Sequence, residues 1–170
     1  MPLFLTPEAG EPHVVFTKRR GDLRRHAGEI SFPGGRRDPE DADLAETALR
    51  EAEEEIGLPR QEVSLLWELP ATSTFVTNYL IHPFVGRIPA GLAWRLSENE
   101  VEQVLELGVP ALRSGRTRTR LTRRGISFQT DAYLVEGHLI WGATARILEH
   151  LLARLNDADL DSAISPATGA

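Results

Sequence analysis

The sequence contains no cysteine, which excludes disulfide bonds and thiolate metal ligands. It also lacks an apolar run of the roughly 20 residues that a membrane-spanning helix needs. The first residues, MPLFLTPEAGEPH, have no basic start followed by a long apolar stretch, so they do not resemble a signal peptide. We therefore expect a cytoplasmic protein that has no membrane as a partner.

Lysine is almost absent, with Lys18 as its only representative, and the net charge is −6. An acidic chain lacks the basic footprint of nonspecific nucleic-acid binding, so nucleic acid is not an expected partner. The charge is unevenly distributed, however. The segment from Arg113 to Arg124 carries six arginines and no acid, whereas the segment from Glu51 to Glu55 is strongly acidic. We expect the arginine-rich segment to decorate an exposed hairpin.

A chain of 170 residues fits one domain with a single core. We place that domain at residues 1–156 and expect residues 157–170, which have no sustained periodicity, to form a flexible tail. Hydrophobic periodicity and turn residues predict the following elements: strands at 2–5, 13–18, 28–35, 63–70 and 74–88; a helix over about 43–56; a short helix or turn at 97–107 before a strand; a hairpin of 116–124 with 126–135; and a helix from 141 or 142 to about 155. The fold class is α/β (α+β), with a mixed sheet and helices on its faces.

The segment from Asp43 to Leu58, DLAETALREAEEEIGL, is the most informative part of the chain. Asp43 followed by Glu46 indicates a capping box at the start of a helix, and Gly57 is a suitable stop at its end. Between them the apolar residues recur on one arc, which we expect to pack against the sheet; they are Ala45, Ala48, Leu49, Ala52 and Ile56.

Glu51, Glu54 and Glu55 lie on a second arc of the same helix, at the i,i+3 and i,i+4 spacings where like charges destabilise a helix. Clustered carboxylates are suitable ligands for a hard divalent cation. A run of glutamates is more often a solvated face, so the helix alone does not establish a metal site. Its context favours one, because Pro33-Gly34-Gly35 lies just upstream, where backbone without a Cβ can approach a phosphate or a metal. Arg50 lies beside the acidic arc and can orient a glutamate.

The combination of this glycine turn and this helix resembles the Nudix box, which runs Gly, five residues, Glu, seven residues, Arg-Glu, aliphatic, any, Glu-Glu, any, Gly, aliphatic. The second half is matched by Arg50, Glu51, Glu54, Glu55 and Gly57-Leu58, with Ala52 in place of the aliphatic residue. The first half departs from the pattern. One residue too many separates Gly35 from Arg50, and Ala42 stands where the box has its first Glu. Asp41 or Asp43 is the candidate substitute, and the sequence does not decide between them.

Residues 16–35, FTKRRGDLRRHAGEISFPGG, are similar to the extension that precedes the box in the coenzyme A diphosphatase branch of the Nudix family. The matching positions are Thr17, Arg19, Leu23, Arg24, His26, Gly28, Phe32, Pro33, Gly34 and Gly35. Residues 140–145, IWGATA, resemble the start of the C-terminal helix of that branch. This resemblance implies a Nudix-like α/β/α sandwich. It also implies hydrolysis of coenzyme A or its derivatives to 3′,5′-adenosine diphosphate and 4′-phosphopantetheine.

The resemblance assigns a role to each candidate site residue. Glu51, Glu54, Glu55 and the Gly35 carbonyl are the expected ligands of Mg²⁺ or Mn²⁺, and Arg50 is expected to support them. The expected phosphate-binding residues are Arg19, Arg24, His26, Arg36, Arg37, Gly34 and Gly35, since coenzyme A carries a diphosphate and a 3′-phosphate. The sequence does not decide whether Glu51, Glu55 or Glu100 is the general base. Glu100 lies where some Nudix enzymes place a catalytic glutamate, but after Ser97 it is equally consistent with helix-capping chemistry.

The expected partner is a small-molecule diphosphate, and a homodimer is allowed by the sequence. Two other functions remain open. One is a nucleotide or ADP-ribose pyrophosphatase of the same fold. The other is a noncatalytic Nudix-like ligand-binding module, although a pure binder would gain nothing from the like charges of Glu51, Glu54 and Glu55.

Overall fold

The computed structural model of the chain describes residues 3–6, 11–22, 26–74, 79–123 and 125–155. Its central sheet contains six strands, which are β1 (Leu3–Thr6), β2 (His13–Arg19), β3 (Ile30–Ser31), β4 (Ser64–Glu68), β7 (Phe84–Pro89) and β8 (Val101–Gly108). β1 pairs with β7 in parallel and with β2 in antiparallel orientation. β2 also pairs with β3 and β8. The sheet is therefore mixed, as the sequence predicts.

The remaining strands form two smaller sheets. β9 (Arg116–Arg123), β10 (Ile126–Val135) and β11 (His138–Trp141) form one of them, and β5 (Thr72–Ser73) pairs with β6 (Leu80–Ile81) in the other. The helices are α1 (Leu44–Ile56), α2 (Val109–Ser114) and α3 (Gly142–Arg154), together with the 3₁₀ helix η1 (Arg60–Glu62). No helix in the described part of the chain is long and apolar enough to cross a membrane.

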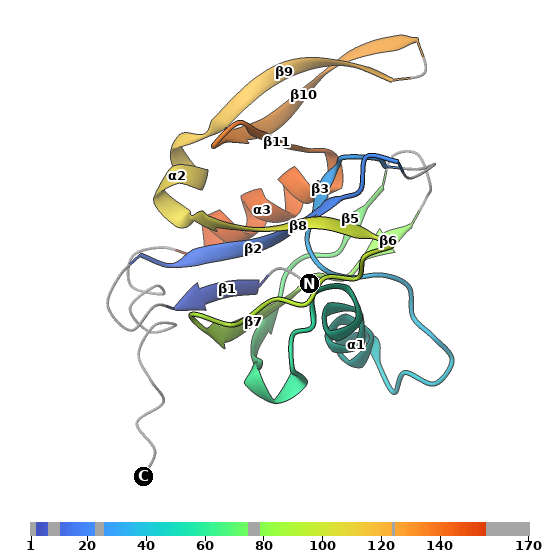
Figure 1. Ribbon diagram of the computed structural model, residues 1–170. Coiled ribbons are helices and arrows are strands. Elements are labelled where there is room, and N and C mark those ends of the chain that lie inside the picture. The colour runs from blue at the N-terminus through green and yellow to red at the C-terminus, as the bar shows by residue number, and fades with distance from the viewer. Residues whose placement is uncertain (1–2, 7–10, 23–25, 75–78, 124, 156–170) are drawn as a thin grey trace.

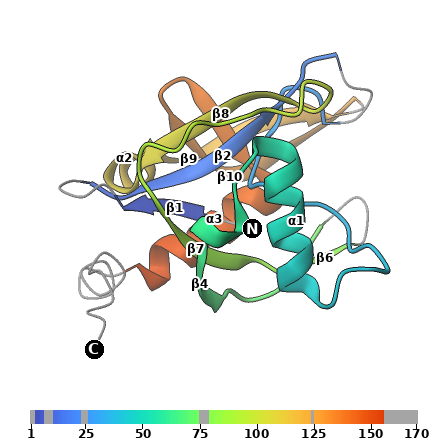
Figure 2. The ribbon, with the colours of Figure 1, turned by 60° about the horizontal axis from the view of Figure 1, so that its bottom comes forward.

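The alternation of side chains along β2 divides the core into two clusters, one on each face of the central sheet. Val14 and Phe16 belong to the larger cluster, which includes the buried face of α3. Val15 belongs to the smaller cluster, together with Ala52 and Ile56 of α1. Figure 1 accordingly shows α1 and α3 on opposite sides of β2 and β8, with the β9–β10–β11 sheet beyond α3. The loop between β3 and α1 projects outward in both views (Figures 1 and 2).

Two of the predicted strands are shorter than expected. The strand expected over residues 74–88 is split into β6 and β7, with Pro83 between them, a residue that has no N–H to donate to a ladder. Residues 97–100 form a turn before β8, one of the two forms that the sequence predicts there, and the N–H groups of Glu100 and Val101 both donate to the Ser97 carbonyl. The strand expected over residues 28–35 is only two residues long in β3, and both Ile30 and Phe32, which follows the strand, are buried. Residues 157–170 lie outside the described residues.

The ends of α1 are formed as the sequence predicts. Asp43 is the N-cap, and its carboxylate accepts a hydrogen bond of 2.9 Å from the Glu46 N–H. Gly57 closes the helix in the left-handed region at φ 67°, and an added Cβ there would lie 2.8 Å from Arg95 Cβ. The Glu46 side chain does not complete the capping box, because it pairs with Arg60 at 2.9 Å. Two local signals thus fix the length of α1 and the direction of its acidic face.

Replacing Asp43 with Ala is expected to lower the free energy of unfolding by about 1 kcal/mol, because the Glu46 N–H loses its acceptor at the helix start. Urea denaturation followed by circular dichroism measures this change. Asp43→Asn is the matched control, since asparagine caps helices about as well as aspartate. Equal destabilisation by Asn and Ala would contradict a capping role for Asp43.

Candidate active site

The glycine turn meets the acidic face of α1. The Gly34 N–H donates to Glu55 Oε2 at 3.1 Å. Gly35 lies against Glu51, so that an added Cβ would come within 2.4 Å of both of its carboxylate oxygens. A side chain at position 35 would therefore displace the Glu51 carboxylate. This contact brings two predicted metal ligands and the backbone of Gly34-Gly35 into one place.

The two glutamates next to the turn carry negative charge that their surroundings compensate only in part. Glu55 is 6% exposed, and its burial raises the pKa of its carboxyl to about 7, against the opposing effect of the Gly34 hydrogen bond. Burial also raises the pKa of Glu51, although Arg50 opposes the shift. The negative charge of Glu100 contributes to both upward pKa shifts. The site therefore favours a cation or a proton.

Arg50 holds the loop and the helix together. Its Nε donates to Asp41 Oδ1 at 3.0 Å and its Nη2 donates to Asp41 Oδ2 at 3.1 Å, which is a two-pronged pair. Nη2 also donates to the Arg36 carbonyl at 2.9 Å. On the helix, the same guanidinium donates to Glu51 at 3.2 Å and to Glu54 at 3.1 Å. One side chain thus connects the projecting loop with two of the three predicted metal ligands.

Of the two candidate acids, Asp41 and not Asp43 is the partner of Arg50. Its carboxylate also accepts hydrogen bonds from Thr47 Oγ1 at 2.8 Å and from the Asp38 N–H at 2.9 Å. Arg50 and these two donors hold the pKa of Asp41 well below its usual range. Asp43, the other candidate in the sequence, is the N-cap of α1. The choice between the two acids was therefore decided by tertiary contacts.

The predicted phosphate-binding residues are spread around this site. Arg19 ends β2, and its Nε is buried without a hydrogen-bond partner among the described residues. The Arg36 guanidinium lies 4.7 Å from the centre of the Tyr79 ring. Arg37 Nη2 donates to the carbonyls of Asp41 and Ala42 at 3.1 Å each. These bonds support the loop, and Arg37 is the member of the set with the clearest structural role.

Two further members of the predicted set lie in the segment after β2. His26 Nδ1 is 2.7 Å from Glu29 Oε2, a contact that no sequence pattern predicted. Arg24 lies outside the described residues. The segment starts close to the acidic site, because the Arg20 N–H donates to the Glu100 carbonyl at 3.1 Å. Glu100 itself follows Ser97, whose N–H donates to the Glu55 carbonyl at 2.9 Å. The turn at residues 97–100 is thus attached to the end of α1.

The three predicted metal ligands do not all converge in this conformation. Within the described ranges, no three His, Cys, Asp or Glu side chains are gathered closely enough to hold a metal ion as they stand. Glu51 and Glu55 adjoin the glycine turn, whereas Glu54, with 58% of its side chain exposed, lies against Arg50. The chemistry of the donors nevertheless fits Mg²⁺ or Mn²⁺, because they are oxygens and two of them have raised pKa values that a cation would lower.

The Asp41–Arg50 pair predicts how stability depends on pH. A carboxyl whose pKa is lower in the folded state stabilises the fold above its unfolded pKa, which is about 3.9 for aspartate. This stabilisation disappears as the pH falls through the folded pKa. Asp41→Asn is therefore expected to be less stable than wild type at pH 5–7, with a difference that shrinks below about pH 4.

Urea denaturation at a series of pH values measures this difference. Asp38→Asn serves as a control, because Asp38 is 64% exposed and lies 3.7 Å from the same guanidinium. We expect this control to track the wild type. A constant difference between Asp41→Asn and wild type from pH 2 to pH 7 would contradict the ion pair as the source of the stability.

Comparison with solved structures identifies the fold. A Nudix hydrolase from Mycobacterium smegmatis, RenU, superimposes with a TM-score of 0.61 over 99% of this chain and 86% of its own, at 13% identity. The Nudix domain of Shewanella oneidensis NrtR, solved with ADP-ribose, gives a TM-score of 0.56 over 91% of this chain and 86% of its own, also at 13% identity. At such identities the likeness concerns the fold alone, and it confirms the predicted fold class.

Sequence comparison gives the family. Proteins named uncharacterized Nudix hydrolase NudL, from Salmonella paratyphi B and Salmonella newport, are 41% identical over 147 residues. These matches cover 85% of this chain and 76% of each relative. The NUDIX domain family matches residues 2–125, a range that includes the glycine turn, the whole of α1 and the turn at Glu100. The chain therefore belongs to the Nudix hydrolase family.

Proposed function

We propose that this protein hydrolyses the diphosphate of a nucleoside-linked substrate in a reaction that depends on Mg²⁺ or Mn²⁺, and that coenzyme A or its derivatives are that substrate. The observation that carries the proposal is the meeting of Glu51 and Glu55 with the Gly34-Gly35 turn. Two carboxylates with raised pKa values lie there against the backbone of the turn. A Cβ at Gly35 would collide with the Glu51 carboxylate. These carboxylate oxygens would hold a divalent cation, which would compensate their charge.

Glu51, Glu54, Glu55 and the Gly35 carbonyl would hold the cation. When bound, Mg²⁺ or Mn²⁺ would neutralise charge on the diphosphate and make the attacking water more acidic. Glu54 would exchange its contact with Arg50 for one with the cation. Arg50 would lose little by this exchange, because its two bonds to Asp41 and its bond to the Arg36 carbonyl would remain.

The phosphate oxygens would be bound by groups on the neighbouring loops. The buried Nε of Arg19 is a donor that lacks a protein acceptor among the described residues, and a phosphoryl oxygen is a suitable partner for it. His26 would donate to a second phosphate group. Glu100 is our choice for the general base. Its negative charge raises the pKa values of both Glu51 and Glu55, and its side chain is exposed on a surface turn. Its carboxylate would accept the proton of the water that attacks phosphorus.

Coenzyme A is favoured over other diphosphates by residues 16–35, which resemble the extension of the coenzyme A diphosphatase branch. The products would be 3′,5′-adenosine diphosphate and 4′-phosphopantetheine. Binding without hydrolysis is a second candidate function, and one observation favours it: Glu51 and Glu54 both accept hydrogen bonds from Arg50. The experiments below separate the two candidates.

We expect kcat/KM to fall by roughly 100-fold or more in each of three variants, Glu51→Gln, Glu54→Gln and Glu55→Gln. The reason is that even groups that only support metal ligands affect activity by about 10–100-fold when they are replaced. The measurement is hydrolysis of coenzyme A with Mg²⁺ and with Mn²⁺. Glu53→Gln is the matched control on the same helix, because Glu53 is exposed and pairs with Arg60 at 2.8 Å. Full turnover by Glu54→Gln, with an unchanged dependence on metal concentration, would remove Glu54 from the metal site.

The choice of substrate is tested by assaying coenzyme A, ADP-ribose and 8-oxo-dGTP side by side at equal concentrations, with product identification by mass spectrometry. We expect the highest kcat/KM for coenzyme A, with 3′,5′-adenosine diphosphate among its products. A higher value for ADP-ribose would assign the protein to the alternative substrate class. Tight binding of any of the three with no metal-dependent hydrolysis would support the noncatalytic candidate.

A further inference from the structure

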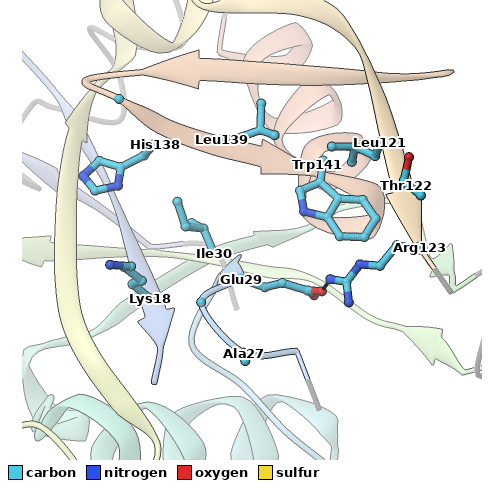
Figure 3. Close-up of a pocket in the computed structure, with 12 residues that line it drawn as sticks. Lys18, Ala27, Glu29, Ile30, Leu121, Thr122, Arg123, His138, Leu139 and Trp141 are labelled. Atoms are coloured by element: carbon cyan, nitrogen blue, oxygen red, sulfur yellow. Dashed lines mark ion pairs between the residues drawn. The ribbon is translucent and has the colours of Figure 1, made fainter. Parts of the chain in front are cut away.

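Glu29 connects two segments that are far apart in the sequence. Its Oε2 accepts a hydrogen bond from His26 Nδ1 at 2.7 Å, and its Oε1 forms an ion pair with Arg123 at the end of β9. The Glu29 side chain is only 19% exposed, so the two contacts occupy a largely enclosed carboxylate. Figure 3 shows the Glu29 and Arg123 side chains pointing toward each other.

The contacts continue from Arg123 to Trp141. The Arg123 guanidinium lies 5.0 Å from the centre of the Trp141 ring, within the range of a cation–π interaction. Trp141 in turn is the N-cap of α3 and packs against Phe128 of β10. Glu29, Arg123 and Trp141 border a cavity of about 490 Å³ between β2–β3 and the β9–β10–β11 sheet (Figure 3). The hairpin is thereby anchored to the segment that carries His26.

The backbone around His26 needs such an anchor. His26 has a φ of 56°, in the left-handed region that a residue with a side chain seldom adopts. Residues held there depend on surrounding contacts. The Glu29 N–H donates to the His26 carbonyl at 3.2 Å, and the Arg19 N–H donates to the Glu29 carbonyl at 3.0 Å. Glu29 therefore fixes both the backbone and the imidazole of His26, and it ties them to the end of β2.

We propose that Glu29 is a positioning residue for substrate binding: its carboxylate orients the His26 imidazole toward a phosphate of the substrate and, through Arg123, fixes the β9–β10 hairpin beside it. This inference rests on the proposed function, because it takes His26 to be a phosphate ligand. With Nδ1 hydrogen-bonded to Glu29, the imidazole would meet the phosphate through Nε2. Glu29 touches neither the metal ligands nor the reacting phosphorus, so its effect falls on binding and not on the chemical step.

Kinetics of coenzyme A hydrolysis test this role. Glu29→Ala is expected to raise KM by about 10-fold, the loss of roughly one hydrogen bond to a charged group, with kcat changed less than about threefold. Glu29→Gln keeps the acceptor for His26 but loses the charge facing Arg123, and its KM is expected to fall between those of Ala and wild type. In a double-mutant cycle, Glu29→Ala is expected to add little to the KM of His26→Ala.

The matched control is Glu102→Gln, which removes an exposed ion pair of 2.6 Å with Lys18 on the neighbouring strand. We expect its KM to equal that of wild type. If Glu29→Ala and Glu102→Gln have the same KM, or if Glu29→Ala lowers kcat with KM unchanged, the positioning role is wrong. Additive effects of Glu29→Ala and His26→Ala on KM would also overturn it.

A readout that is independent of turnover separates this inference from the proposed function. The ¹⁵N signals of the His26 imidazole are expected to report a hydrogen-bonded Nδ1 in wild type and Glu102→Gln and to lose this signature in Glu29→Ala. An unchanged signature in Glu29→Ala overturns the inference even if coenzyme A is hydrolysed. Loss of the signature with no coenzyme A turnover by wild type refutes the proposed function and leaves the orientation of His26 by Glu29 in place. Glu29→Gln provides the same comparison if Glu29→Ala does not fold.

Discussion

The Arg50 guanidinium donates to the Asp41 carboxylate, to the Arg36 carbonyl, and to Glu51 and Glu54 on its own helix. Two of these partners lie in the loop before α1, so this side chain attaches the loop to the helix. The loop begins at the Gly34-Gly35 turn, which in turn adjoins Glu51 and Glu55. A planar guanidinium with five donors can serve several acceptors at once, which a lysine ammonium in the same place could not do with the same geometry.

The same arrangement explains how an acidic helix face can be stable before it binds anything. Glu51 and Glu54 lie at spacings where their charges repel, and Arg50 offsets that repulsion. Glu55 has no such partner among the described residues except the Gly34 N–H, and burial raises the pKa of its carboxyl. Arg50 therefore compensates Glu51 and Glu54, whereas the Glu55 end of the face is uncompensated. In our proposal the cation belongs at that uncompensated end.

Much of the fold follows from local patterns. The capping aspartate and the terminal glycine set the length of α1, and the alternation in β2 places Val15 against α1 and Phe16 against the opposite cluster. The hairpin of β9 and β10 was recognisable from its two strands and the glycine between them. The strand predicted over 74–88 is two strands, β6 and β7, on either side of Pro83. A proline interrupts a strand where a backbone N–H would have to bond to a neighbouring strand, and the pairing of the strands is not visible in the sequence.

A glycine turn followed by a helix with three glutamates on one arc could be predicted from the sequence, because helical periodicity fixes which side chains share a face. The family could be predicted as well, since the order and spacing of these residues are specific. Contacts in the folded chain were needed to show that Asp41 and not Asp43 pairs with Arg50, that Glu54 turns toward Arg50, and that Glu29 contacts both His26 and Arg123. Those outcomes depend on the path of loops and the rotamers of long side chains, which are set by contacts between segments that are distant in sequence.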